Sequence, residues 1–259
     1  MLGDANTFPK RILQIWYNFK LPSTEWNKPH ALPPSFAAWR QSWLRYHPDY
    51  EHLLWNNEDN RNFVKDNFPE YLDVYDGYQR EIERVDAVRY MFMYSKGGIY
   101  ADLDHEALRP FDTLLDQRKS DDIILGHLEV DASTPQWANH AIPNSLMISK
   151  PQCDFWLFVI DEMVRRAKGT PTGDHALLDA VEYKTGPVLL TECVRAYKGD
   201  SKITILPTEA FYPINWTRME PMHQPLRQRI VSEGHHLSHE QARAMFPHSL
   251  TVTYWTHTW

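Results

Sequence analysis

The segment EIERVDAVRYMFMYSKGGIYADLD, residues 81–104, carries the clearest secondary-structure signals in the chain. Its first part predicts a helix over residues 81–96, because Val85, Val88 and Phe92 recur on one face at helical spacing. The pair of glycines that follows supplies a helix stop, since glycine readily adopts the left-handed conformation that ends many helices. The apolar run after the glycines predicts a short strand, IYADLD, with two aspartates at its end. A helix that leads directly into a strand is typical of an α/β protein.

The segments on either side of this one continue the alternation of strands and helices. Strands are expected at 11–16, 50–55, 122–128, 145–149, 202–206 and 250–254, and helices at 36–46, 60–68, 154–167, 174–183 and 188–197. Such an order predicts a sheet with crossover helices. The chain shows no internal repeat, low-complexity segment or linker. We therefore expect one α/β domain over residues 1–259, with a Rossmann-like mixed sheet flanked by helices.

The composition is that of a soluble globular protein. Of the 259 residues, 42% are hydrophobic and 24% charged, and the formal net charge is −7, which disfavours nucleic acid and anionic membranes as main partners. The 10 tryptophans and 13 tyrosines are a heavy aromatic load, which mostly builds core, although a surplus often lines sugar or nucleotide sites. No run approaches the roughly 20 apolar residues of a membrane span. We expect a soluble, cytoplasmic chain without a transmembrane span.

The two aspartates at the end of the central segment, Asp102 and Asp104, suggest a metal site. In an extended chain, residues two apart point the same way and lie about 6.6 Å from each other. Two such carboxylates suit a hard divalent cation that shares its shell with phosphates. The pair also follows a strand, where open α/β sheets bind their ligands. Taken alone, the same spacing equally fits two solvated turn residues.

The surrounding sequence resembles a known family. ERVDAVRYMFMYSKGGIYADLD is similar to the signature of glycosyltransferase family 32, the DXD-containing sugar transferases that include fungal initiating α-1,6-mannosyltransferases and mannosyltransferases of inositol sphingolipids. It resembles the large clostridial glucosylating toxins more distantly. FPKRILQIW near the start, TGPVLLTECV at 185–194 and the final YWTHTW match further parts of the pattern in order. The resemblance implies a GT-A fold.

The family pattern also assigns roles to individual residues. Asp86, Arg89, Asp102 and Asp104 would form the catalytic group, and Trp16, Arg84, Asp86, Arg89, Tyr100, Asp102 and Trp259 would bind the donor. Trp16 would stack on the nucleotide base, although a core tryptophan fits the same position. Asp86 and Arg89 would contact hydroxyls of the donor, although a plain helical ion pair also explains their spacing.

The resemblance implies Mn²⁺ or Mg²⁺ as the cofactor. Asp104 would be its direct ligand, and Asp102 would reach it through water. The tail departs from the family pattern, because Thr253 stands where many members have a histidine. We therefore expect His257 to be the third protein ligand. Asn144 and His127 would lie on the acceptor side.

The activity implied is transfer of a hexose, with retention of configuration, from a nucleotide diphosphate sugar to a hydroxyl acceptor such as a glycan, glycolipid or small molecule. GDP-mannose is the first expectation for the donor, and UDP-galactose, UDP-glucose and UDP-N-acetylglucosamine are the alternatives. Two other classes stay open: a D-x-D phosphohydrolase and a non-catalytic sugar-binding module. Because family members are commonly Golgi enzymes, a Golgi lumen location is the alternative if an N-terminal anchor has been removed.

Overall fold

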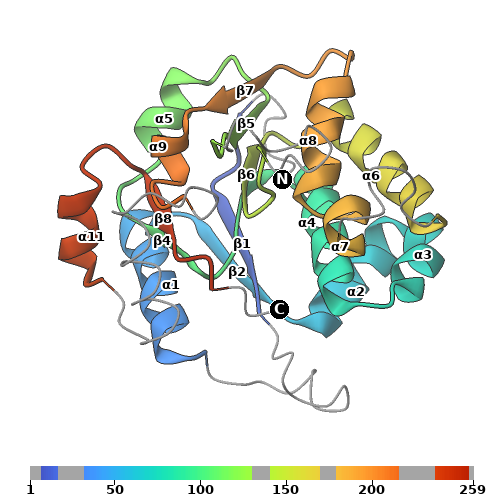
Figure 1. Ribbon diagram of the computed structural model, residues 1–259, viewed down its shortest axis with the longest axis horizontal. Coiled ribbons are helices and arrows are strands. Elements are labelled where there is room, and N and C mark those ends of the chain that lie inside the picture. The colour runs from blue at the N-terminus through green and yellow to red at the C-terminus, as the bar shows by residue number, and fades with distance from the viewer. Residues whose placement is uncertain (1–6, 17–31, 130–140, 170–178, 216–236, 257–259) are drawn as a thin grey trace.

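A computed structural model of the chain describes residues 7–16, 32–129, 141–169, 179–215 and 237–256 (Figure 1). Its main sheet has six strands in the order β2-β1-β3-β6-β5-β7. Their bounds are β1 Arg11–Ile15, β2 Glu51–Trp55, β3 Gly98–Ala101, β5 Ile123–Gly126, β6 Leu146–Ser149 and β7 Ile203–Leu206. Strand β6 runs antiparallel to β3 and β5, and the other neighbours are parallel. The sheet is therefore mixed, as expected.

A second, smaller sheet joins two segments that are distant in the sequence. Strand β4, His105–Ala107, pairs antiparallel with β8, Thr251–Thr253. The register places His105 opposite Thr253, directly after the two aspartates. This pairing brings the C-terminal part of the described chain to the end of β3.

Helices cover both faces of the main sheet (Figure 1). The helices are α1 Pro34–Tyr46, α2 Asn57–Asn67, the 3-10 turn η2 Pro69–Tyr71, α3 Leu72–Gly77, α4 Glu81–Ser95, α5 Asp112–Gln117, α6 Asp154–Ala167, α7 Ala180–Lys184, α8 Pro187–Ala196, α9 Thr208–Phe211 and α11 His239–Met245. Helices α2, α4, α6 and α8 contribute to one apolar cluster, and α1, α5, α9 and α11 contribute to another. The α/β fold class, with a mixed sheet flanked by helices, is confirmed. The one-domain boundary stays a prediction.

Alternate residues of each strand supply the two clusters. In β1, Leu13 and Ile15 belong to the α4 cluster, whereas Ile12 belongs to the α1 cluster. In β3, Tyr100 faces the first cluster and Ile99 the second. This period of two is what a sheet buried on both faces requires.

Helix α4 is buried over most of its length. Every residue from Val85 to Met93 is buried, including Asp86 and Arg89. Polar side chains in such a place must pair, because an unpaired buried charge is costly. The helix ends before Gly97 and Gly98, which have φ values of +62° and +99°. These left-handed glycines turn the chain into β3, as the sequence indicates.

None of the helices within the described ranges combines the length and the apolar character needed to cross a bilayer.

Candidate active site

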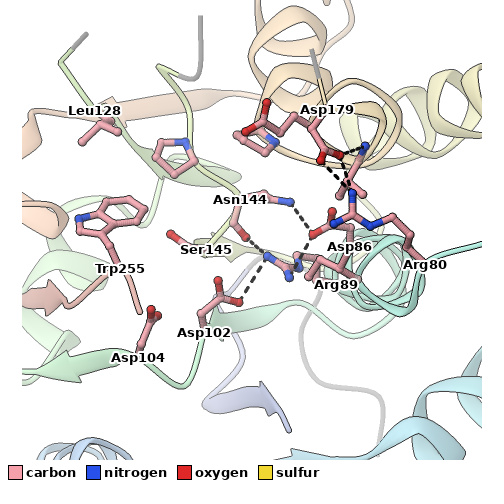
Figure 2. A pocket seen from close by; sticks show the side chains of 15 residues that line it. Arg80, Asp86, Arg89, Asp102, Asp104, Leu128, Asn144, Ser145, Asp179 and Trp255 are labelled. Atoms are coloured by element: carbon pink, nitrogen blue, oxygen red, sulfur yellow. Dashed lines mark hydrogen bonds and ion pairs between the residues drawn. The ribbon is translucent and has the colours of Figure 1, made fainter. Parts of the chain in front are cut away.

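A cavity of about 230 Å³ opens at the carboxyl end of β3 (Figure 2). Five residues predicted for the site line it together: Asp86, Arg89, Asp102, Asp104 and Asn144. They come from α4, from the turn after β3 and from the segment that leads into β6. The structure thus gathers in one place side chains that the sequence separates by up to 58 positions.

Arg89 is the centre of a buried hydrogen-bond network at the floor of this cavity (Figure 2). Its Nη2 lies 3.1 Å from Oδ1 of Asp86, and its Nη1 lies 3.4 Å from Oδ1 of Asp102. The same Nη1 donates to the backbone oxygen of Asn144 at 2.9 Å. The guanidinium also lies over the ring of Tyr100, 4.6 Å from its centroid. These contacts fix Arg89 between the two carboxylates.

Asp86 forms an ion pair with Arg89 and accepts hydrogen bonds from two other side chains. Besides Arg89, the side-chain amide of Asn144 donates to its Oδ1 at 3.0 Å, and Thr185 Oγ1 donates to its Oδ2 at 2.9 Å. Burial raises the pKa of Asp86 to about 7, while Arg89, Thr185 and Asn144 oppose this rise. Burial works against the charge of Arg89 as well, yet Asp102, Tyr100 and Asp86 raise its pKa above the ordinary value. Arg89 therefore favours the charged form of Asp86, and Asp86 favours the charged form of Arg89.

The two aspartates of the DXD motif lie in a turn and not in an extended strand. Strand β3 ends at Ala101, and the backbone N–H of His105 donates to the oxygen of Asp102 at 3.0 Å. The expectation of an extended D-x-D segment is therefore wrong. The turn forms because β4 leaves the main sheet to pair with β8. Both carboxylates nevertheless line the cavity.

Asp102 is anchored at its backbone and at one carboxylate oxygen. Its N–H donates to the oxygen of Ser145 at 2.8 Å. The Tyr100 hydroxyl donates to Oδ1 at 2.5 Å, and Arg89 also contacts Oδ1. Burial raises the pKa of Asp102, whereas Arg89 and Tyr100 lower it. Tyr100 thus holds the Asp102 carboxylate through its hydroxyl, but Tyr100 itself does not line the cavity.

The segment after β8 closes on Asp104. The backbone N–H of Thr256 donates to Oδ2 of Asp104 at 2.9 Å, and the Thr256 hydroxyl contacts the same oxygen at 3.2 Å. Burial raises the pKa of Asp104 to about 6, and Asp102 adds to this rise while Thr256 opposes it. The neighbouring Trp255 lines the cavity wall above Asp104 (Figure 2). The sequence gives no role to Thr256 or Trp255, because only the tail's likeness to the family marks this region.

The two carboxylates that line the cavity are ligands of the kind that a hard divalent cation prefers. Within the described ranges, no group of three or more His, Cys, Asp or Glu side chains could hold a metal ion. Asp102 and Asp104 present two carboxylates to the cavity. Mg²⁺ is usually held by one or two carboxylates, with waters and substrate phosphates completing its shell, and Mn²⁺ favours the same oxygen ligands. His257 and Trp259 lie outside the described residues.

Three other predicted residues do not line the cavity. Arg84 pairs with Glu81 and donates to the backbone oxygen of Tyr78 at 2.6 Å, so it braces the connection between α3 and α4. Trp16 packs against Phe36, with ring centroids 5.1 Å apart. His127 is half-buried beside the site; its neighbour Leu128 belongs to the lining, and the histidine does not. The donor and acceptor roles of these three side chains stay predictions.

The far end of the cavity holds an ion pair that the sequence does not mark. Arg80, just before α4, lies 2.7 Å from Oδ1 of Asp179, the residue that caps α7 (Figure 2). Both line the cavity opposite Asp104 and Trp255. No motif contains them, because the contact joins segments 99 positions apart.

Part of this chain matches a known protein family, and curated proteins are similar to it. Residues 33–121 match the family described as a glycosyltransferase sugar-binding region containing a DXD motif. Inositol phosphoceramide mannosyltransferase 2 of Schizosaccharomyces pombe is 30% identical over 171 residues, which are 64% of this chain and 41% of the relative. Inositol phosphoceramide mannosyltransferase 3 of the same organism is 32% identical over 193 residues, covering 73% of this chain and 45% of the relative. The chain spans less than half the length of these relatives.

Among solved structures, PaToxG glycosyltransferase aligns with a TM-score of 0.43 and 15% identity. The alignment covers 72% of this chain and 69% of that one.

Proposed function

This chain belongs to the glycosyltransferase family whose sugar-binding region contains a DXD motif, and we propose that it transfers a hexose from a nucleotide diphosphate sugar to a hydroxyl group. One observation carries the proposal. The DXD carboxylates and the Asp86–Arg89 pair, which come from different elements, line a single cavity. If the two aspartates were ordinary solvated turn residues, their carboxylates would not be expected to share a cavity with a buried ion pair.

Asp104 and Asp102 would hold a divalent cation, Mn²⁺ or Mg²⁺. When bound, the cation would supply positive charge to the diphosphate, where negative charge develops as the glycosidic bond breaks. Both residues carry carboxylate oxygens to the cavity, and Thr256 fixes the orientation of Asp104. His257 remains our proposal for a third protein ligand.

The network around Arg89 would position the donor sugar. Arg89 lines the cavity with its guanidinium held by Asp86, Asp102 and Asn144, so its charge is fixed before the substrate binds. Such preorganised charge stabilises a transition state without reorganisation during the reaction. The Asp86 carboxylate would orient hydroxyl groups of the donor, and Asn144, which donates to Asp86, remains our proposal for the acceptor side. Positioning of this kind contributes a large share of the rate in group transfer.

We propose that transfer retains the anomeric configuration. Asp86 is already paired with Arg89 and accepts hydrogen bonds from Asn144 and Thr185, which makes its carboxylate a poor nucleophile. A front-face displacement needs no protein nucleophile. In it, the bond from the sugar to the phosphate oxygen breaks, the acceptor oxygen bonds to the anomeric carbon on the same face, and the departing phosphate oxygen takes the acceptor proton.

GDP-mannose is the proposed donor, because the two Schizosaccharomyces pombe relatives are named as mannosyltransferases. Their names also favour a glycolipid acceptor of the inositol phosphoceramide type over a soluble glycan. UDP-sugars remain the alternative donors.

A donor-hydrolysis screen tests the proposal. GDP-mannose, UDP-galactose, UDP-glucose and UDP-N-acetylglucosamine are each incubated with the chain and Mn²⁺, and free sugar is measured with and without inositol phosphoceramide. We expect slow release from GDP-mannose and its conversion to glycolipid when the acceptor is present. Release from a UDP-sugar alone would change the donor assignment. Release of inorganic phosphate without sugar would favour a phosphohydrolase, and nucleotide binding without any turnover would favour a sugar-binding module.

A further inference from the structure

Glu106 is a buried carboxylate close to the DXD motif that the proposed reaction does not use. It lies in β4, two residues after Asp104, and is 4% exposed. It does not belong to the set of residues that lines the cavity. Burying a carboxylate is costly unless hydrogen bonds compensate for the lost water. Its partners therefore indicate what the side chain does.

Both oxygens of Glu106 are engaged by other elements. Oε1 lies 2.5 Å from Nδ1 of His239 in α11, and Oε2 accepts the hydroxyl of Tyr254 at 2.5 Å. On the other side of the imidazole, Nε2 lies 2.9 Å from the hydroxyl of Tyr46 in α1. One carboxylate thus connects β4 with α11, with α1 and with the segment that follows β8.

This segment is the one that closes on Asp104. The backbone N–H of Tyr254 donates to the backbone oxygen of Asp104 at 3.1 Å, and Thr256 donates to the Asp104 carboxylate. Between them Trp255 has a φ of +48°. The chain therefore turns sharply, so that Tyr254 reaches into the protein toward Glu106 while Trp255 lines the cavity.

Tyr254 also packs against an aromatic ring, and this contact does not involve the Glu106 carboxylate. Its ring stacks on Trp39, with centroids 4.5 Å apart and planes inclined by 16°. Apolar packing tolerates small shifts, whereas the short hydrogen bond from the Tyr254 hydroxyl to the Glu106 carboxylate fixes both distance and direction. The arrangement resembles the outer partners that orient ligands at metal sites.

We propose that Glu106 is a positioning residue. Through Tyr254 it holds residues 254–256 against Asp104, while His239 contacts its other oxygen, and it thereby sets the orientation of the carboxylate that receives the cation and the donor diphosphate. The last step rests on the proposed function; the docking of the segment does not.

Substitutions of Glu106 separate this role from simple packing. Glu106→Ala removes both hydrogen bonds, whereas Glu106→Gln keeps the shape and can accept from Tyr254 while donating to His239. Tyr254→Phe keeps the stack on Trp39 and removes only the hydroxyl, so it carries the test if Glu106→Ala does not fold. Val64→Ala, a cavity mutation in the other core, is the matched control for lost stability because Val64 is fully buried far from the segment's partners.

The first readout needs no ligand. Hydrogen exchange at the amides of Tyr254 and Thr256 should accelerate at least about tenfold in Glu106→Ala and Tyr254→Phe, because the hydrogen bonds to Asp104 open more often. It should stay close to the unsubstituted rate in Glu106→Gln and Val64→Ala. Unchanged protection of these two amides in Tyr254→Phe and Glu106→Ala would overturn the proposal.

The second readout is the dissociation constant of Mn²⁺ with GDP, measured by calorimetry. We expect it to rise by about tenfold to 100-fold in Glu106→Ala, as for other outer partners of metal ligands, with rescue by Glu106→Gln. Equal affinity in Glu106→Ala and the unsubstituted chain would overturn the positioning role and leave the proposed function standing. Absence of Mn²⁺–GDP binding in the unsubstituted chain would instead overturn the proposed function, and the last step of this inference with it.

Discussion

At the scale of single residues, the pair formed by Asp86 and Arg89 decides whether the site can exist. Both side chains are almost fully buried in α4, and their nitrogen and oxygen atoms come within 3.1 Å. A buried pair of this kind adds little net stability, yet removing one partner leaves a charge stranded in the interior. The pair is therefore better explained by a need to place a fixed charge at the cavity floor than by a need for stability.

The first prediction concerns this pair. Arg89→Ala should lower the free energy of unfolding by about 3 to 5 kcal/mol, because Asp86 loses the cation that offsets its burial. Urea denaturation measures the change. The control is Arg61→Ala, which removes an exposed pair with Asp76 and should cost less than about 1 kcal/mol. Equal losses in the two variants would show that Asp86 does not depend on Arg89.

The second prediction concerns pH. Burial and Asp102 raise the pKa of Asp104 to about 6 in the metal-free chain. A cation binds the ionised carboxylate, so protons compete with it. The affinity for Mn²⁺ should therefore be nearly constant above pH 7 and fall as the pH drops below about 6. Calorimetric titration between pH 5 and 8 measures this, and an affinity that rises on acidification would contradict it.

Most of the site residues that could be predicted from the sequence lie within the motif, and Asn144 is the exception. Asp86, Arg89, Asp102 and Asp104 lie within one continuous segment, and all four line the cavity. Thr256 could not be predicted, because it reaches Asp104 through the pairing of β4 with β8, a contact between residues more than 140 positions apart. The turn at the aspartates escaped prediction for the same reason.

At the scale of elements, the long helices and the strands of the main sheet follow from periodicity. Helix α6, predicted at 154–167, spans Asp154–Ala167, and α4 ends within one residue of its predicted limit. The short elements β4, α5 and α9 were not predicted. Elements of three to six residues are too short to be stable alone and form through tertiary contacts, which local patterns do not show. Helix α2 begins earlier than predicted because Asn56 caps it.

The third prediction tests the turn from α4 into β3. Gly97 has a φ of +62°, and an added Cβ would lie 2.7 Å from the backbone oxygen of Ser149. Gly97→Ala should therefore cost more than about 1 kcal/mol, the usual penalty for a left-handed residue with a side chain. The control is Gly77→Ala, because no atom lies within 4 Å of a Cβ added there. Thermal unfolding compares the two, and equal stability would contradict the strained turn.

At the scale of the whole molecule, the sheet separates two apolar cores and presents the site at one end of its central strands. Helix α4 belongs to one core, whereas β8 and the segment after it belong to the other. The cavity needs both, since Arg89 comes from the first and Trp255 from the second. The site therefore lies where the two cores meet, and each core holds a different part of its lining.

The most direct test of the central claim is the Mn²⁺-dependent release of mannose from GDP-mannose by the unsubstituted chain and by Asp104→Asn. The variant keeps the size of the side chain and an oxygen that can accept from Thr256, so the fold should persist, as circular dichroism can show. Since a bound cation contributes several kcal/mol to charge stabilisation, release should fall by at least about a hundredfold. Near-normal release by a folded Asp104→Asn chain would contradict the metal–diphosphate site.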